Sequence, residues 1–256
     1  MNTRAWPAAP LGATRQRLRT AWAIVHLGAL LLALALSPST YRRPWRTPLA
    51  VQVVRAAWPL LPWFTLLSAL LALVVVRIVL VTAQSYGLSA LALEMLVRVL
   101  VLELIPLGAA LAVALRVTLP LAAELAAARR RGALGADALR REIAPRALAG
   151  VFCVLLVAAL GALVALVLTY LLAYGFTPWA LPRYTRLVGQ VFAPVVALVF
   201  VLKTLALAVA VSLMPIGSAL HGHDAHDGVG LEVQGLVRMF VVVLAVEVAA
   251  LAGNYL

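Results

Sequence analysis

Five long apolar stretches constrain this chain more than any other feature of its sequence. They cover residues 58–82, 91–115, 147–174, 188–214 and 233–252. The hydrocarbon core of a bilayer is about 30 Å thick, and an α-helix of roughly 20 apolar residues crosses it. The alternation of apolar and polar residues that marks the strands of a membrane barrel is missing. The sequence therefore predicts an all-α integral membrane protein with five transmembrane helices.

The composition agrees with a membrane protein and excludes several other classes. Hydrophobic residues make up 65% of the 256 residues and charged residues 12%, whereas a soluble domain is about half apolar and a quarter charged. This balance excludes an ordinary soluble enzyme, a disordered chain and a fibrous protein. Cys153 is the single cysteine, so the chain can form neither an intrachain disulfide nor a cysteine-rich metal site.

The positions of the arginines predict the orientation of the spans. Segment 116–146 holds seven arginines, whereas loop 83–90 has no basic residue and loop 175–187 has two. Because cytoplasmic loops are enriched in Lys and Arg, we expect segment 116–146 inside and the two loops outside. Segment 215–232 then falls inside, with the N-terminus cytoplasmic and the C-terminus outside. The net charge of +12 thus flanks the spans and forms no soluble basic face, which argues against a nucleic-acid partner.

The N-terminal region, residues 1–57, is basic and contains a shorter apolar run at residues 21–36. Arginines flank this run on both sides. If the run crossed the bilayer, the two arginine groups would lie on opposite sides, which the positive-inside rule disfavours. We therefore expect an interfacial or re-entrant helix here, with a spanning helix and a signal peptide as the alternatives.

Charged residues inside the apolar stretches are the candidate functional positions, because a charge in hydrocarbon is costly and is usually paired or functional. Arg77 lies in the first predicted span, Glu103 in the second, Lys203 in the fourth and Glu247 in the fifth. We predict that Glu103 and Lys203 meet in the interior of the bundle, where they line a substrate path or hold the helices together. A purely structural pair, or side chains that snorkel to the interface, is the alternative.

Prolines, a charge pair and small residues predict local features of the spans. Pro106 and Pro194 each remove a backbone donor, so each is expected to kink its helix. Glu94 and Arg98 are four residues apart and share a helix face. The third span carries small residues that permit close helix contact, namely Gly150, Ala158, Gly161, Ala162 and Ala165.

A polar cluster of histidines and aspartates lies between the fourth and fifth predicted spans. It contains His221, His223 and His226 together with Asp224 and Asp227. Imidazoles and carboxylates at this spacing suit Zn²⁺ or Ni²⁺, but a plain polar loop or a pH-dependent loop explains them as well. We expect no metal site and retain the three histidines as the only candidate ligands.

Nucleotide-binding and hydrolase motifs are missing from the chain. The sequence contains no G-x-x-x-x-G-K-[ST] loop, no G-x-S-x-G and no H-E-x-x-H, and these patterns carry phosphate binding, serine catalysis and zinc catalysis. We therefore expect that the chain binds no cofactor and is not itself an enzyme.

Several short motifs resemble the MlaE/YrbE family of ABC-transporter permeases. Glu103-Leu104-Ile105-Pro106 is similar to the Glu-Leu-Gly-Pro of that family, and Lys203 occupies the place of a family lysine in the fourth span. Further similar stretches are Arg116-Val117, Ala122-Ala123-Glu124-Leu125, Ala144-Pro145-Arg146-Ala147-Leu148-Ala149-Gly150 and Gly228-Val229-Gly230. The chain departs from the pattern at Leu102, Thr118 and Ala126, which replace a family arginine and two family glycines.

The resemblance implies a five-span permease domain over residues 58–256 that works as a homodimer in the inner membrane of a bacterium. It would move lipids, phospholipid-like in class, between this membrane and a periplasmic MCE-domain carrier protein. A separate cytoplasmic ABC ATPase would hydrolyse ATP, and some systems add a STAS-domain subunit. The alternatives are a degenerate, non-transporting subunit that anchors or regulates an assembly, and a secondary transporter or membrane enzyme.

The resemblance also implies that the ATPase docks on segment 116–146, whose Ala, Leu, Arg and Glu content favours a helix. The charged residues expected to couple the two subunits are Arg116, Glu124, Arg129, Arg130, Arg131, Asp137, Arg140 and Arg141. The alternative is a solvated loop that binds anionic lipid head groups.

Overall fold

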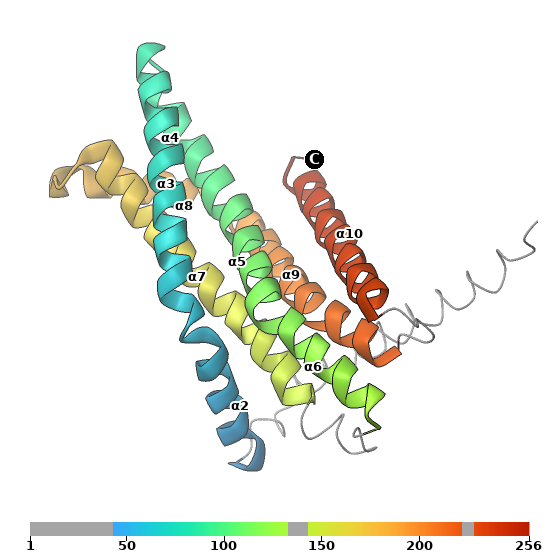
Figure 1. Cartoon of the computed structure of the whole chain (residues 1–256). Coiled ribbons are helices and arrows are strands. Elements are labelled where there is room, and N and C mark those ends of the chain that lie inside the picture. The colour runs from blue at the N-terminus through green and yellow to red at the C-terminus, as the bar shows by residue number, and fades with distance from the viewer. Residues whose placement is uncertain (1–42, 133–142, 222–227, 256) are drawn as a thin grey trace, which may run out of the picture.

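A computed structural model describes residues 43–132, 143–221 and 228–255, and Figure 1 shows them as a bundle of long helices. Five helices are long and apolar enough to cross a membrane: Leu60–Ser85, Leu91–Arg130, Ala144–Tyr174, Pro194–Leu220 and Gly235–Gly253. Within the described ranges no strand occurs. The predicted all-α class with five spans is therefore confirmed. The interfacial helix predicted at residues 21–36 lies outside the described residues.

A helix that we did not predict, α2 (Arg43–Ala57), precedes the first span. It packs against the first part of α7 (Ala144–Tyr174) and leads through Trp58 and Pro59 into α3 (Leu60–Ser85). Leu49 and Ala57 are buried, whereas Val51 and Val54 are exposed. This stretch is basic, but its apolar residues suffice for a short packed helix.

The second span is much longer than predicted and consists of five consecutive helical pieces. These are α4 (Ser89–Val97), the π-helical η2 (Arg98–Leu104), α5 (Ile105–Val113), the π-helical η3 (Ala114–Thr118) and α6 (Leu119–Arg130). The helix continues past residue 115, the predicted end of the apolar stretch, as far as Arg130. The first half of segment 116–146 is therefore a rigid extension of a span, which Figure 1 shows as the light-green α6.

The two prolines differ in where they lie. Pro106 lies inside the second span, at the start of α5 and directly after η2, and its kink stays a prediction. Pro194 begins α9 (Pro194–His221) and does not lie inside a span. A 3₁₀ turn at Pro178–Ala180 and the separate helix α8 (Leu181–Val191) precede it, so the predicted start of the fourth span at residue 188 is too early.

Small residues on α7 allow the neighbouring helices to approach closely, as predicted. A Cβ atom added at Gly161 would lie 2.9 Å from Phe64 Cε1 on α3 and 3.0 Å from Ile105 Cγ2 on α5. At Gly150 it would lie 2.8 Å from Ser212 Oγ on α9. α7 therefore packs against three other spans within the same chain. The last helix, α10 (Gly228–Tyr255), packs chiefly against α9.

Tyr184 anchors α8 to the third span. Its hydroxyl donates a hydrogen bond of 2.9 Å to the carbonyl of Leu166, and its ring lies 5.3 Å from that of Tyr170. Burial, and then the nearby Tyr174, raises the pKa of Tyr184, so the hydroxyl stays protonated and keeps donating even in alkaline solution.

Replacing Tyr184 with phenylalanine is expected to lower stability by about 1 kcal/mol, because the ring contacts persist and only one hydrogen bond is lost. Thermal unfolding of the detergent-solubilised chain measures the change. Tyr86→Phe is the control, since Tyr86 is exposed. Equal melting temperatures for the two variants would contradict the anchoring role.

An intramembrane lysine–glutamate cluster

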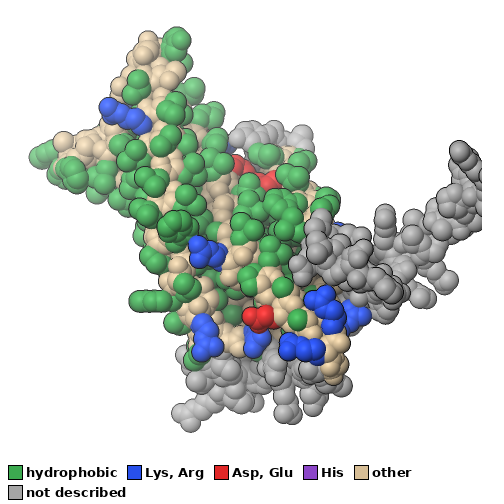
Figure 2. All heavy atoms as spheres, viewed as in Figure 1, with side chains coloured by type: hydrophobic (Ala, Val, Ile, Leu, Met, Phe, Trp, Pro, Cys, Tyr) green, Lys and Arg blue, Asp and Glu red, His purple; other side chains and the backbone are tan. Residues whose placement is uncertain are grey.

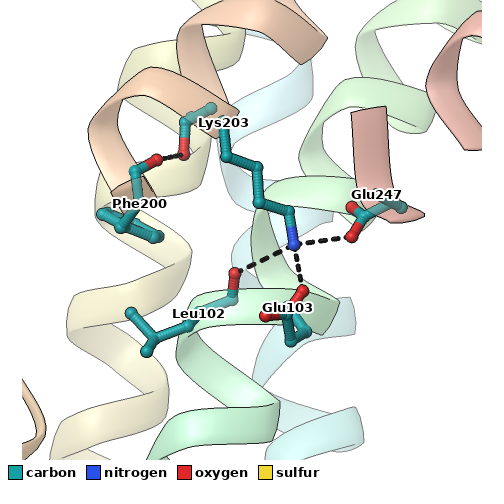
Figure 3. Close-up of polar contacts among 6 residues, drawn as sticks. Leu102, Glu103, Phe200, Lys203 and Glu247 are labelled. Carbon is teal, nitrogen blue, oxygen red and sulfur yellow. Dashed lines mark hydrogen bonds and ion pairs between the residues drawn. The ribbon is translucent and has the colours of Figure 1, made fainter. Parts of the chain in front are cut away.

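Three spans contribute to one buried charge cluster around Lys203. The ammonium of Lys203 on α9 pairs with Glu103 Oε2 on η2 and lies 2.6 Å from Glu247 Oε2 on α10. It also donates to the carbonyl of Leu102 at 3.3 Å. Figure 3 shows the lysine side chain extended between the two helices that carry the glutamates. The predicted meeting of Glu103 and Lys203 is therefore present, and Glu247 joins it.

The local sequence explains why a backbone carbonyl takes part. Pro106 has no amide hydrogen, so the helical turn before it lacks one backbone donor. Leu102 and Glu103 both lie in the π-helical turn η2, and such turns recur at functional sites because they re-aim side chains and carbonyls. The Lys203 ammonium donates to the carbonyl of Leu102 within this turn.

The cluster holds two carboxylates and one ammonium, which gives it a formal charge of −1. The Lys203 side chain is only 2% exposed, whereas Glu103 and Glu247 keep 15% and 11% of their side-chain surface accessible. Glu247 Oε1 is buried and has no hydrogen-bond partner among the described residues. The carboxylates therefore hold the lysine while they keep a small part of their side-chain surface accessible.

Of the remaining intramembrane candidates, Pro106 follows the cluster closely in sequence, whereas Arg77 lies on a different helix, α3. Pro106 is buried. Arg77 is exposed on α3 and lies away from the face that α3 buries, which runs through Phe64, Ala72 and Val76. The predicted pair of Glu94 and Arg98 forms with 3.5 Å between Glu94 Oε1 and Arg98 Nη2.

The residues expected to couple to an ATPase lie at the opposite end of the second span. Arg116 is in η3 and Glu124 in α6, where Glu124 Oε2 lies 4.0 Å from Arg146 Nη1 of α7. Arg129 Nη1 donates to the carbonyl of Ala219 near the end of α9, at 3.3 Å. Arg130 and Arg131 are exposed.

Some predicted positions fall outside what the structure describes. They are Asp137, Arg140, Arg141, His223 and His226, and the side chain of His221 at the end of α9. In the described ranges, no group of His, Cys, Asp and Glu has the arrangement to hold a metal ion. The metal candidates therefore remain a prediction.

Five apolar helices, three of them joined by a buried cluster of charges, indicate a multi-pass membrane protein. A comparison with protein families matches residues 49–252 to the family described as Permease MlaE, and the chain belongs to that family. The chain is thus a permease subunit of an ABC transporter and not an enzyme. A search of curated proteins found no match.

Proposed function

We propose that this chain moves lipids, phospholipid-like in class, as the permease subunit of an ABC transporter in the bacterial inner membrane. The observation that carries the proposal is the Lys203 cluster, which joins the second, fourth and fifth spans at a depth where unpaired charges are costly. In a permease of this family, such a cluster is the natural contact for the polar head of a lipid whose chains lie in hydrocarbon.

The accessible edges of the two carboxylates support a role beyond holding the helices together. Glu103 and Glu247 are the partly exposed members of the cluster, whereas Lys203 is enclosed. A lipid head group with hydrogen-bond donors can therefore reach the carboxylates without displacing the lysine. We propose that a second copy of the chain closes this edge into a shared lipid cavity, and that a periplasmic MCE-domain protein exchanges lipid with it.

A direct connection links the proposed ATPase side to the cluster. α6 extends the second span beyond Arg116, and Arg129 near its end bonds to Ala219 of α9, the helix that carries Lys203. We propose that a separate cytoplasmic ATPase docks on α6 and that its movements reach the cluster through α9. The positive-inside rule places this arginine-rich end in the cytoplasm. A STAS-domain subunit is a further proposed partner.

ATP-driven lipid movement in proteoliposomes tests the proposed function. The chain is co-reconstituted with a candidate ABC ATPase, and transfer of a fluorescent phospholipid is followed with and without ATP. Arg129→Ala is expected to lower the lipid moved per ATP hydrolysed, because it removes the link from α6 to α9. Arg183→Ala is the control, since this arginine is exposed on α8, away from α6.

Two outcomes would contradict the proposal. If the ATPase fails to bind and lipid nevertheless moves along an ion gradient, the chain works as a secondary transporter. If the ATPase binds and hydrolyses ATP but no lipid moves with any head group tested, the chain is a non-transporting subunit that anchors the assembly.

A further inference from the structure

A second polar site lies at the arginine-rich end of the bundle, in a cavity of about 440 Å³. Its walls come from the end of α2, the beginnings of α3 and α7, and the stretch from η3 into α6. Its polar lining includes Arg55, Arg116, Arg146 and Glu124. Figure 2 shows blue basic side chains gathered at this end of the molecule around red carboxylate atoms, below a mostly green apolar face.

The charges of this cavity favour an anion. Three guanidinium groups face one carboxylate, which leaves a formal charge of +2. Among the described residues of the cavity, Arg146 pairs with Glu124 at a long 4.0 Å, and their side chains are 39% and 72% exposed. Such a pair holds little energy, so the arginines remain free to bind a ligand. Guanidinium groups suit phosphate oxygens because they donate two parallel hydrogen bonds.

Apolar walls beside the arginines favour an anion that carries hydrocarbon. Leu60, Val117 and Leu121 line the same cavity. α2, which forms one wall, exposes Val51 and Val54, and Trp58 at its end is also exposed. Exposed tryptophans are typical of the membrane interface. The exposed tryptophan beside the arginines favours a position near the phosphates of a bilayer.

We propose that this cavity binds the phosphodiester head group of an anionic phospholipid through Arg55, Arg116 and Arg146. The bound lipid would tie α2 to α6, the helix on which the ATPase is proposed to dock. The site is separate from the Lys203 cluster, since Arg116 follows Glu103 by 13 residues, about 20 Å along a helix. It goes beyond the proposed transport function, because lipid binding here requires neither ATP nor a partner. Basic pockets between spans at this depth commonly hold anionic head groups.

Lipid binding to the purified full chain in neutral detergent tests the site, with phosphatidylglycerol, phosphatidylcholine and inorganic phosphate as three separate probes in native mass spectrometry. Phosphatidylglycerol is expected to bind in preference to phosphatidylcholine. The Arg55→Gln, Arg116→Gln double variant should weaken it by at least about tenfold, since each charged hydrogen bond lost costs about that factor. Arg183→Gln, Arg186→Gln is the control, because these exposed arginines lie on α8.

Glu124→Gln is expected to strengthen phosphatidylglycerol binding, because it removes the one carboxylate and releases Arg146. A gain of binding does not arise from misfolding, so this variant keeps the test decisive. Equal binding of the two lipids, no loss in the double variant, or no gain in Glu124→Gln would overturn the proposal. Full competition of inorganic phosphate with the lipid would also overturn it. A double variant that still binds the lipid but no longer binds the ATPase would overturn it as well. That last result would make the cavity a protein-docking site.

Discussion

Replacing Lys203 with methionine is expected to destabilise the protein by about 3–5 kcal/mol, the usual cost of removing one partner from a buried ion pair. Methionine keeps the length of the side chain and removes the ammonium. Glu103 and Glu247 then face each other across spans with no cation between them, and the Leu102 carbonyl loses a donor. We expect the contact between η2, α9 and α10 to open and lipid movement to stop.

Thermal unfolding in detergent measures the loss, and neutral variants separate structure from transport. Adding Glu103→Gln and Glu247→Gln to Lys203→Met leaves an uncharged cluster, which should recover much of the stability. If the cluster also contacts the lipid head group, this triple variant folds and binds its ATPase but moves no lipid. Full transport by the triple variant would show that the cluster is only structural.

Arg77→Met is the matched control for this series. Arg77 is also a charged residue within a span, but it is exposed on α3. Its replacement should not lower stability, because an exposed charge within a span is itself costly. If Arg77→Met lowered stability as much as Lys203→Met, the loss would come from removing any charge within a span and not from breaking the cluster.

The second large effect is expected at Gly161, where leucine should lower stability by about 3 kcal/mol or more. The added side chain meets Phe64 of α3 and Ile105 of α5 at 2.9 and 3.0 Å already at its first carbon. Overpacking of a tight core costs about 1–3 kcal/mol even for smaller insertions. The helices α3, α5 and α7 must separate to admit the leucine, and the position of η2, directly before α5, shifts with them.

Unfolding by denaturant in mixed micelles measures this change against Gly253→Leu. Gly253 is also a helical glycine, on α10, but a Cβ atom there meets nothing within 4 Å. Because leucine favours helix over glycine, the control should be neutral or slightly stabilising. A similar response of the two variants would contradict the close packing of α7 against its neighbours.

Local sequence was sufficient to predict the spans and the contact at Lys203. A run of about 20 apolar residues has no stable place except in a membrane or a large core, so the five spans are visible without any tertiary information. Likewise, a lysine and a glutamate inside separate spans are expected to pair, because hydrocarbon offers neither charge another partner. The close contact of Gly150 and Gly161 with other spans was also predictable. Small residues permit helices to approach closely, whereas larger residues prevent it.

Other features depended on contacts between distant segments. The continuation of the second span to Arg130, the start of α9 at Pro194 and the packing of α2 on α7 all escaped prediction. Helix ends in polar sequence are decided by tertiary packing, since propensity alone changes little from one residue to the next. The link from Arg129 to Ala219 joins residues 90 positions apart, and local sequence carries no signal for it.

By itself, the sequence determined the class of protein, the number of spans and the charged residues that hydrocarbon forces to pair, because the cost of burying charge and backbone in lipid is large and local. Only the tertiary structure decided that Glu247 joins Glu103 around one lysine. It also decided that three arginines from α2, η3 and α7 face one cavity. Both arrangements depend on which helices are neighbours. The helix surfaces are uniformly rich in Leu, Val and Ala, so individual residues do not determine which helices pack together.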